Sequence, residues 1–309
     1  MLKFGRQPLL LALATVASMF ALAATQPVAA SSTNLAGLNS SHAVLVISDS
    51  NKGQASSKGI QLRGALRSGG LIIGKTQPTS QVWLNQQALS VSNSGHVVFG
   101  FGRDTNGSQT LTVQHANGEQ HVLELLISAR DYAIDRVDGV PQRTVTPNPE
   151  QQQRTRKEAE KVWLARTVSS TREDYLQPLI MPAQGRISGV YGSQRIFNGT
   201  PRNPHYGLDI AAPTGTPVQA PWPGKVVLAE PDLFYSGGTL IIDHGFGITT
   251  TYIHLNQLHV KVDDNIEQGQ HIADIGATGR VTGPHLDWRI NWGHERLDPA
   301  LALEHFQAE

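Results

Sequence analysis

Short apolar runs separated by turn residues fill the chain from Ala43 to about Arg130. Each run has the length of a β-strand, and Asn117-Gly118 between the last two is a strong hairpin signal. Strands this short at this spacing are typical of a small sandwich or barrel. The predicted strands are Ala43–Ile47, Gly70–Gly74, Gln81–Asn85, His96–Phe101, Thr110–Ala116 and His121–Ile127.

A different pattern follows Pro147-Asn148-Pro149, which interrupts the strands. The segment from Glu150 to about Thr167 is charged and helix-favouring, with Val162, Trp163 and Leu164 as its apolar patch. Its charge run predicts a solvated face. We expect a linker helix at about 150–167, either between two domains or packed along both.

From Leu179 onward, turns rich in Gly and Pro again separate short apolar runs. This texture predicts a second β-domain that ends near Pro299, followed by a short helix at Leu301–Phe306. The fold class is therefore mainly all-β. Strands are predicted at PVQA (217–220), KVVLAE (225–230), TLIIDH (239–244), ITTTYIHL (248–255), HIADIG (271–276) and HLDWRI (285–290).

The N-terminus has the pattern of a secretory signal peptide. Lys3 and Arg6 precede an apolar run from Pro8 to Ala24, and small residues follow it up to Ala30. The run is shorter than the ~20 apolar residues of a membrane span, so we expect cleavage rather than anchoring. The predicted organisation is a signal peptide at 1–30, a flexible leader at 31–42, an N-terminal β-domain at 43–130, a linker at 131–178, a second domain at 179–302 and a tail at 303–309.

Composition excludes several classes of function. Lys+Arg and Asp+Glu both number 25 in 309 residues, so no basic surface for nucleic acid is expected. The chain has no cysteine, which excludes disulfides, thiolate metal sites and cysteine nucleophiles.

Candidate chemistry is concentrated in three segments of the second domain. Residues two apart on a strand share a face, so His285 and Asp287 point the same way, and His254 is predicted to share a face with Tyr252. His205 and Asp209 have the same parity if their segment is extended. Imidazoles and carboxylates aimed into one groove are how a fold gathers ligands for a metal ion with an open position.

The sequence motifs around these residues follow one another in a characteristic order. They are GRISGVYG (185–192), PHYGLDIAAPTGTPV (204–218), APWPGKV (220–226), IDHGFGITTTYIHL (242–255), EQGQHIADIGATGRVTGPHL (267–286) and LDP (297–299). Over about residues 180–302 this closely resembles the lysostaphin/LytM-type zinc endopeptidases that cut peptidoglycan peptides. The resemblance implies an antiparallel β-sheet groove with one zinc ion on its floor. Residues 43–130 resemble, more loosely, the β-domain that precedes the catalytic domain in some proteobacterial members.

The resemblance also assigns roles. His205 and Asp209 match zinc ligands, whereas His254 and His285 match the catalytic histidines that orient or deprotonate water and stabilise an oxyanion. The third zinc ligand of the family is a histidine, and here that position is Asp287. A carboxylate is an acceptable zinc ligand, although a second one favours harder divalent ions. The alternatives are a weakened or lost site, or substitution by His244, for which we prefer a structural role.

We therefore expect an exported, periplasmic or secreted zinc endopeptidase that acts on peptidoglycan peptides. One alternative is a catalytically inactive relative that binds or activates other cell-wall hydrolases, and another is a murein-binding scaffold that acts through residues 43–130. Arg195 and Asn198 either bind substrate or belong to a loop that turns at Asn198-Gly199. A regulatory protein partner is compatible with the sequence, whereas nucleic acid and a membrane anchor after cleavage are not expected.

Overall fold

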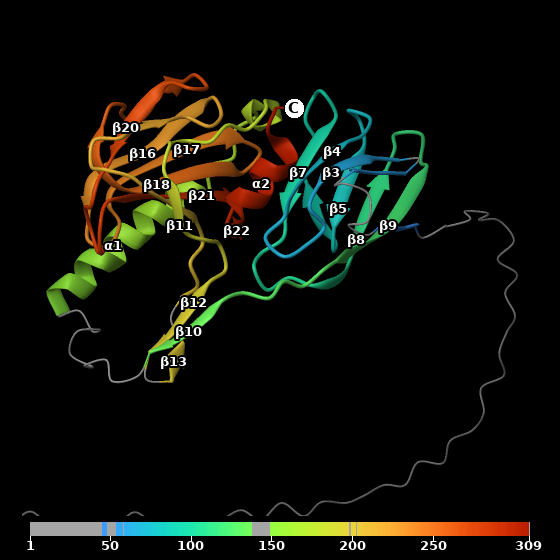
Figure 1. Ribbon diagram of the computed structural model, residues 1–309. Coiled ribbons are helices and arrows are strands. Elements are labelled where there is room, and N and C mark those ends of the chain that lie inside the picture. Colours follow the sequence, from blue (N-terminus) through green and yellow to red (C-terminus); the bar gives the residue numbers. More distant parts are fainter. Residues whose placement is uncertain are drawn as a thin grey trace, which may run out of the picture. The chain divides into compact units, whose positions relative to one another are not determined.

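The computed structural model describes residues 45–47, 54–57, 59–137, 149–197, 199–201 and 203–308 (Figure 1). The chain divides into the units Met1–Ser41 and His42–Glu309, and everything below concerns the second. The predicted signal peptide and leader lie outside the described residues. In the part of the chain that is described, no helix combines the length and the apolar character that crossing a membrane requires.

The predicted fold class is confirmed, because strands dominate the described residues (Figure 1). The N-terminal region forms a five-stranded sheet in the order β1-β9-β8-β5-β6 and a four-stranded sheet in the order β2-β3-β4-β7. Side chains from both sheets, such as Val82 and Phe99, share one apolar core, as in a sandwich. The strands are β1 (Leu45–Ile47), β2 (Gln54–Ser56), β3 (Gln61–Gly64), β4 (Leu71–Lys75), β5 (Gln81–Leu84), β6 (Gln87–Leu89), β7 (His96–Gly100), β8 (Gly107–Gln114) and β9 (Gln120–Ile127).

The C-terminal region is built on a ten-stranded sheet with the main order β11-β14-β21-β18-β17-β16-β19. All of its strand pairs are antiparallel. Strand β20 pairs with β15 and β18, and β22 pairs with β21. The strands are β11 (Arg186–Gly189), β14 (Leu208–Ala211), β15 (Pro217–Gln219), β16 (Gly224–Leu233), β17 (Gly237–Gly245), β18 (Ile248–Leu258), β19 (Asn265–Ile266), β20 (His271–Ile275), β21 (His285–Trp292) and β22 (Glu295–Leu297).

Several short strands escaped prediction. The sequence missed β2, β3, β6, β11, β14, β19 and β22, and also the small sheet of β10 (Ile134–Val137), β12 (Gln194–Phe197) and β13 (Thr200–Pro201). Each has at most four residues, which is too few for an alternating pattern to stand out. The predicted hairpin at Asn117-Gly118 is confirmed, because these residues lie in the turn between the paired strands β8 and β9.

Helix α1 (Pro149–Arg166) begins at a proline, whose missing N–H costs nothing at the first helical position. Its polar face carries an Arg154–Glu158 pair at 2.6 Å. Of the predicted apolar patch only Val162 packs inward, because Trp163 and Leu164 are 52% and 53% exposed. Ala165, which was not predicted, is buried beside Val162 against Leu228 of β16 and Ile241 of β17.

Asp298 joins the N-terminal region to the end of the chain. Its carboxylate accepts a hydrogen bond from the Ala300 N–H at 2.8 Å, which caps α2 (Pro299–Phe306). The same carboxylate pairs with the Arg130 guanidinium at 2.7 Å, and Asp298 is 3% exposed. A buried, two-partner carboxylate ties the chain after β9 to the C-terminal helix. The domain boundaries at 130 and 179 stay predictions.

Candidate active site

One row of paired residues crosses the C-terminal sheet at the place where the candidate ligands lie. Asp209 of β14 is directly opposite Asp287 of β21, so both carboxylates project from the same face. His205, in the segment before β14, has its Nε2 atom 3.2 Å from Oδ1 of Asp209. Its Nδ1 atom lies 3.9 Å from Oδ2 of Asp287. The fold therefore brings together one ligand atom from each of the three predicted metal ligands, all within 4.8 Å of one another.

The local chemistry of this trio fits a cation. Nε2 of His205 and Oδ1 of Asp209 are buried and have no hydrogen-bond partner among the described residues. Buried polar atoms are normally hydrogen-bonded, so these two atoms, which lie 3.2 Å apart in an ion-pair contact without hydrogen-bond geometry, suit a cation that binds beside both. Glycines keep the space open. A Cβ atom on Gly207 would lie 2.0 Å from Oδ1 of Asp287, and one on Gly189 would lie 2.2 Å from Oδ2 of Asp209.

Asp287 has a second partner that the sequence analysis missed. Arg289 is two residues further along β21 and donates from Nε to Oδ1 at 2.9 Å and from Nη2 to Oδ2 at 2.6 Å. Asp287 is 3% exposed, and burial works to raise the pKa of its carboxyl group. The Arg289 charge and hydrogen bonds outweigh burial and hold that pKa well below its usual value. The sequence could have indicated this pair, because Asp287 and Arg289 are two residues apart and side chains at that spacing share one face of a strand.

His254 reaches the site through a distortion of β18. Its backbone φ is +68°, and the pairing register shifts here, with Tyr252 opposite Leu240 but Leu255 opposite Gly238. The prediction that His254 shares a face with Tyr252 is wrong. Tyr252 is opposite Trp288, on the face away from Asp287, whereas the His254 ring lies 4.9 Å from the His285 ring. The bulge turns the imidazole to the ligand side.

Both histidines of this pair are anchored by their Nδ1 atoms. Nδ1–H of His254 donates to the Thr278 carbonyl oxygen at 2.9 Å, and Nδ1–H of His285 donates to the Gly283 carbonyl oxygen at 2.9 Å. In the neutral rings this leaves each Nε2 atom with a free lone pair. Nε2 of His285 lies 4.0 Å from Oδ1 of Asp209. Burial, the largest influence, lowers the pKa of His254.

The remaining candidates lie elsewhere. His244 is fully buried, and its two ring nitrogens are engaged by the Pro223 carbonyl oxygen at 2.5 Å and Oγ1 of Thr250 at 2.7 Å. It therefore has no free lone pair for a metal. Arg195 is on β12, in the three-stranded sheet with β10 and β13 rather than in the sheet that carries the ligands. Asn198 lies outside the described residues.

The segment that carries this site is similar to known proteins. Residues 203–299 match the model of Peptidase family M23. Peptidoglycan DD-endopeptidase ShyA of Vibrio cholerae is 41% identical over 106 residues, which are 34% of this chain and 24% of ShyA. Cell division protein DipM of Caulobacter vibrioides is 31% identical over 128 residues, which are 40% of this chain and 20% of DipM. The chain thus spans a quarter or less of the length of these relatives.

A solved structure extends the similarity beyond that segment. The crystal structure of an M23 peptidase candidate from Pseudomonas aeruginosa is 27% identical, with a TM-score of 0.58, and the match covers 77% of this chain and 95% of that one. A match over 77% of the chain is longer than residues 203–299, so the structural similarity extends beyond that segment.

Proposed function

We propose that this chain, whose residues 203–299 match the model of Peptidase family M23, is an exported metal-dependent endopeptidase that hydrolyses peptide bonds of peptidoglycan. The observation that carries the proposal is the convergence of His205, Asp209 and Asp287, in which Nε2 of His205 and Oδ1 of Asp209 make no hydrogen bond, with two anchored histidines next to them. ShyA is named a peptidoglycan DD-endopeptidase, and we extend its substrate class to this chain. The pattern of residues 1–30 supports export to the periplasm or beyond.

His205, Asp209 and Asp287 would hold the metal. One imidazole and two carboxylates suit zinc, and the second carboxylate also admits harder divalent ions. A divalent ion in this place supplies Lewis-acid polarisation of the scissile carbonyl group and lowers the pKa of water.

His254 and His285 would handle the protons. Burial keeps His254 neutral near pH 7, and its Nδ1 anchor leaves Nε2 to accept a proton from the attacking water. His285 has the same arrangement, with Nε2 facing Asp209. Once protonated, this Nε2 atom donates to the oxyanion or to the leaving amine. The fixed rings save the entropy of orienting them at each turnover.

One observation favours a second function, a catalytically inactive factor that binds peptidoglycan or other cell-wall hydrolases at the site of His205, Asp209 and Asp287, called the groove below. Arg289 already gives Asp287 a cationic partner on both carboxylate oxygens. A carboxylate has about four lone-pair sites, so a metal can still share Asp287. The guanidinium charge nevertheless opposes a divalent cation at the same group, which weakens the site.

Digestion of purified sacculi separates the two functions. The mature protein, residues 31–309, is incubated with sacculi alone, with chelator, and with chelator followed by zinc or manganese. Mass spectrometry then identifies released peptides and newly freed amines. Metal-dependent release supports the endopeptidase, and a His285→Ala variant should release none. Absence of release under every condition, with the protein still pelleting with the sacculi, would instead establish the binding factor.

A further inference from the structure

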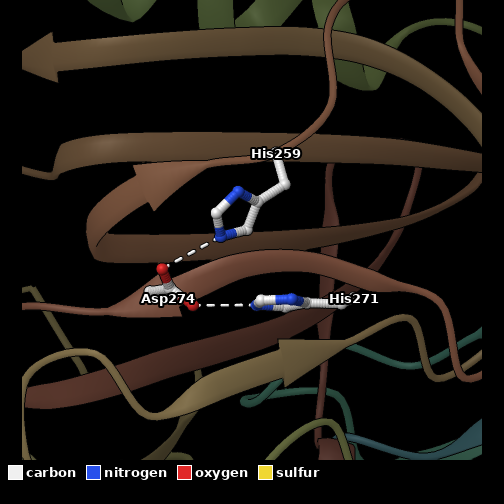
Figure 2. Close-up of side chains that lie close together, drawn as sticks. All are labelled: His259, His271 and Asp274. Atoms are coloured by element: carbon white, nitrogen blue, oxygen red, sulfur yellow. Dashed lines mark hydrogen bonds and ion pairs between the residues drawn. The ribbon is translucent and has the colours of Figure 1, made fainter.

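A second group of potential metal ligands lies at the edge where β18 ends beside β20. His259 follows the last residue of β18, and its Nε2 atom is 2.9 Å from Oδ2 of Asp274. His271 begins β20, and its Nε2 atom is 2.8 Å from Oδ1 of the same carboxylate. Figure 2 shows the two imidazoles pointing at Asp274, one from His259 just after β18 and one from His271 on β20. The three residues are the His259 cluster below.

A β-bulge creates this arrangement. In a regular strand His271 and Asp274, three residues apart, would point to opposite faces. Strand β20 instead has an irregular register against β15, with Val218 opposite Ala273 but Gln219 opposite His271. The extra residue, Ile272, is buried together with Ala273. His271 and Asp274 therefore project from the same face, and a bulge that re-aims a side chain is a common device beside functional sites.

The backbone also fixes the third member of the group. The His259 N–H donates to the Ile272 carbonyl oxygen at 2.9 Å, which continues the β18–β20 ladder to this residue. Asp274 itself is opposite Gln257 of β18. All three side chains thus project from paired backbone, so little conformational entropy is lost when they converge on a ligand.

We propose that the His259 cluster binds a divalent transition-metal ion, with zinc as the reference ion. Neighbouring ligands around a tetrahedral ion with bonds of ~2.1 Å lie about 3.4 Å apart, so the nitrogen–oxygen distances of 2.9 and 2.8 Å need to lengthen by only about half an ångström. Two imidazoles and one carboxylate suit zinc, nickel or copper better than magnesium or calcium. Each imidazole binds the ion through the lone pair of its Nε2 atom, with the ring proton on Nδ1.

Burial and charge agree with this assignment. The side chains of His271 and His259 are 48% and 29% exposed, so an ion has a path from solvent and can complete its coordination with water. Desolvation works to raise the pKa of Asp274, but the hydrogen bonds from His271 and His259 hold it below its usual value. The carboxylate is therefore charged across the neutral pH range. No residue is shared with the groove ligands His205, Asp209 and Asp287.

Metal counting tests the proposal without relying on activity. The mature protein is dialysed against zinc at pH 7.5, and bound zinc is measured by mass spectrometry. A His205→Ala variant, which lacks a groove ligand, should keep one equivalent in the His259 cluster. Adding His271→Gln should remove that equivalent, whereas adding His294→Gln, an exposed histidine outside both clusters, should not.

Thermal unfolding supplies the second readout. Zinc should raise the melting temperature of His205→Ala but not of His205→Ala/His271→Gln, because an ion that binds only the folded state stabilises it. Equal melting temperatures of the two variants in chelator would show that His271→Gln folds normally. The proposal is overturned if His205→Ala binds no zinc at tenfold molar excess, or if the equivalent it binds survives both His259→Gln and His271→Gln. A wild-type protein that binds a single zinc equivalent, which His271→Gln removes and His205→Ala does not, would count against the proposed function and leave the His259 cluster intact.

Discussion

Asp287 and Arg289, two residues apart on β21, form a two-point ion pair with nitrogen–oxygen distances of 2.9 and 2.6 Å. Asp287 stands where the resembling zinc endopeptidases have a histidine ligand, and its charge is balanced by a cation from its own strand. A metal ion in the groove must share this carboxylate with a guanidinium. The strength of the proposed metal site would therefore depend on Arg289, a residue that is not among its ligands.

Replacing Arg289 should strengthen the metal site. In a His271→Gln background, Arg289→Gln should raise zinc affinity in the groove about 10-fold, because a positive charge next to the ion is removed. Without zinc the same variant should lose ~3–5 kcal/mol of unfolding free energy, since Asp287 is left buried and unpaired. Zinc titration and urea unfolding measure the two effects. Weaker zinc binding in Arg289→Gln would mean that Arg289 positions Asp287 as a ligand.

Asp287→Asn tests whether the carboxylate is a ligand at all. The amide keeps the shape of the side chain but removes its charge and one anionic oxygen. We expect at least a 10-fold loss of zinc affinity in the groove and a matching loss of peptide release. Asp263→Asn, at an exposed residue paired with Lys225, is the control and should change neither. Unchanged zinc binding in Asp287→Asn would exclude Asp287 from the ligand set.

The strained backbone at His254 predicts a difference between two substitutions. Removing the imidazole by His254→Gly or His254→Ala should lower cleavage by about 10²- to 10⁴-fold, the range for a general base. Only glycine adopts the observed φ of +68° without cost, so the glycine variant should be about 1 kcal/mol more stable than the alanine variant. Urea unfolding of both proteins checks this. An alanine variant as stable as the glycine variant would mean that the bulge relaxes once the imidazole is gone.

Gly207 should be intolerant of a methyl group. A Cβ atom there would lie 2.0 Å from Oδ1 of Asp287, so Gly207→Ala must displace the carboxylate and break its pair with Arg289. We expect a loss of ~1–3 kcal/mol in unfolding free energy and of the groove zinc equivalent. Gly283→Ala is the matched control, because its Cβ would meet no atom within 4 Å. Normal zinc binding by Gly207→Ala would show that Asp287 is dispensable.

The short apolar runs predicted the mainly β architecture. The convergence of His205, Asp209 and Asp287 was predicted from the motifs shared with a known family, because such motifs carry long-range information that local patterns lack. The prediction that His254 shares a face with Tyr252 assumed that side chains alternate regularly along β18. It was wrong because one residue with a left-handed backbone conformation reverses the face of the side chains after it. Arg289 was missed because an arginine on a strand next to a carboxylate has no distinctive local pattern. The His259 cluster was invisible for the same reason as His254, since it depends on a bulge that only the paired strands reveal.

His244 predicts how stability depends on pH. Complete burial lowers its pKa to about 4, whereas an unfolded histidine titrates near ~6.5. Above pH ~6.5 both states are neutral at this residue, and its contribution to stability is fully present. Between pH ~6.5 and 4 the unfolded chain takes up a proton that the folded protein refuses, so the unfolding free energy falls by ~1.4 kcal/mol per pH unit and by ~3 kcal/mol in total.

Urea unfolding at pH 7, 5.5 and 4.5 measures this loss. Other groups titrate in the same range, so the decisive quantity is the difference between the wild type and His244→Gln. The glutamine amide can bond the Pro223 carbonyl oxygen or Thr250 but cannot take up a proton. Its unfolding free energy should be lower at pH 7 and fall less steeply as the pH decreases, so the two curves converge toward pH 4. Parallel curves would mean that His244 is protonated in the folded protein at the same pH as in the unfolded chain.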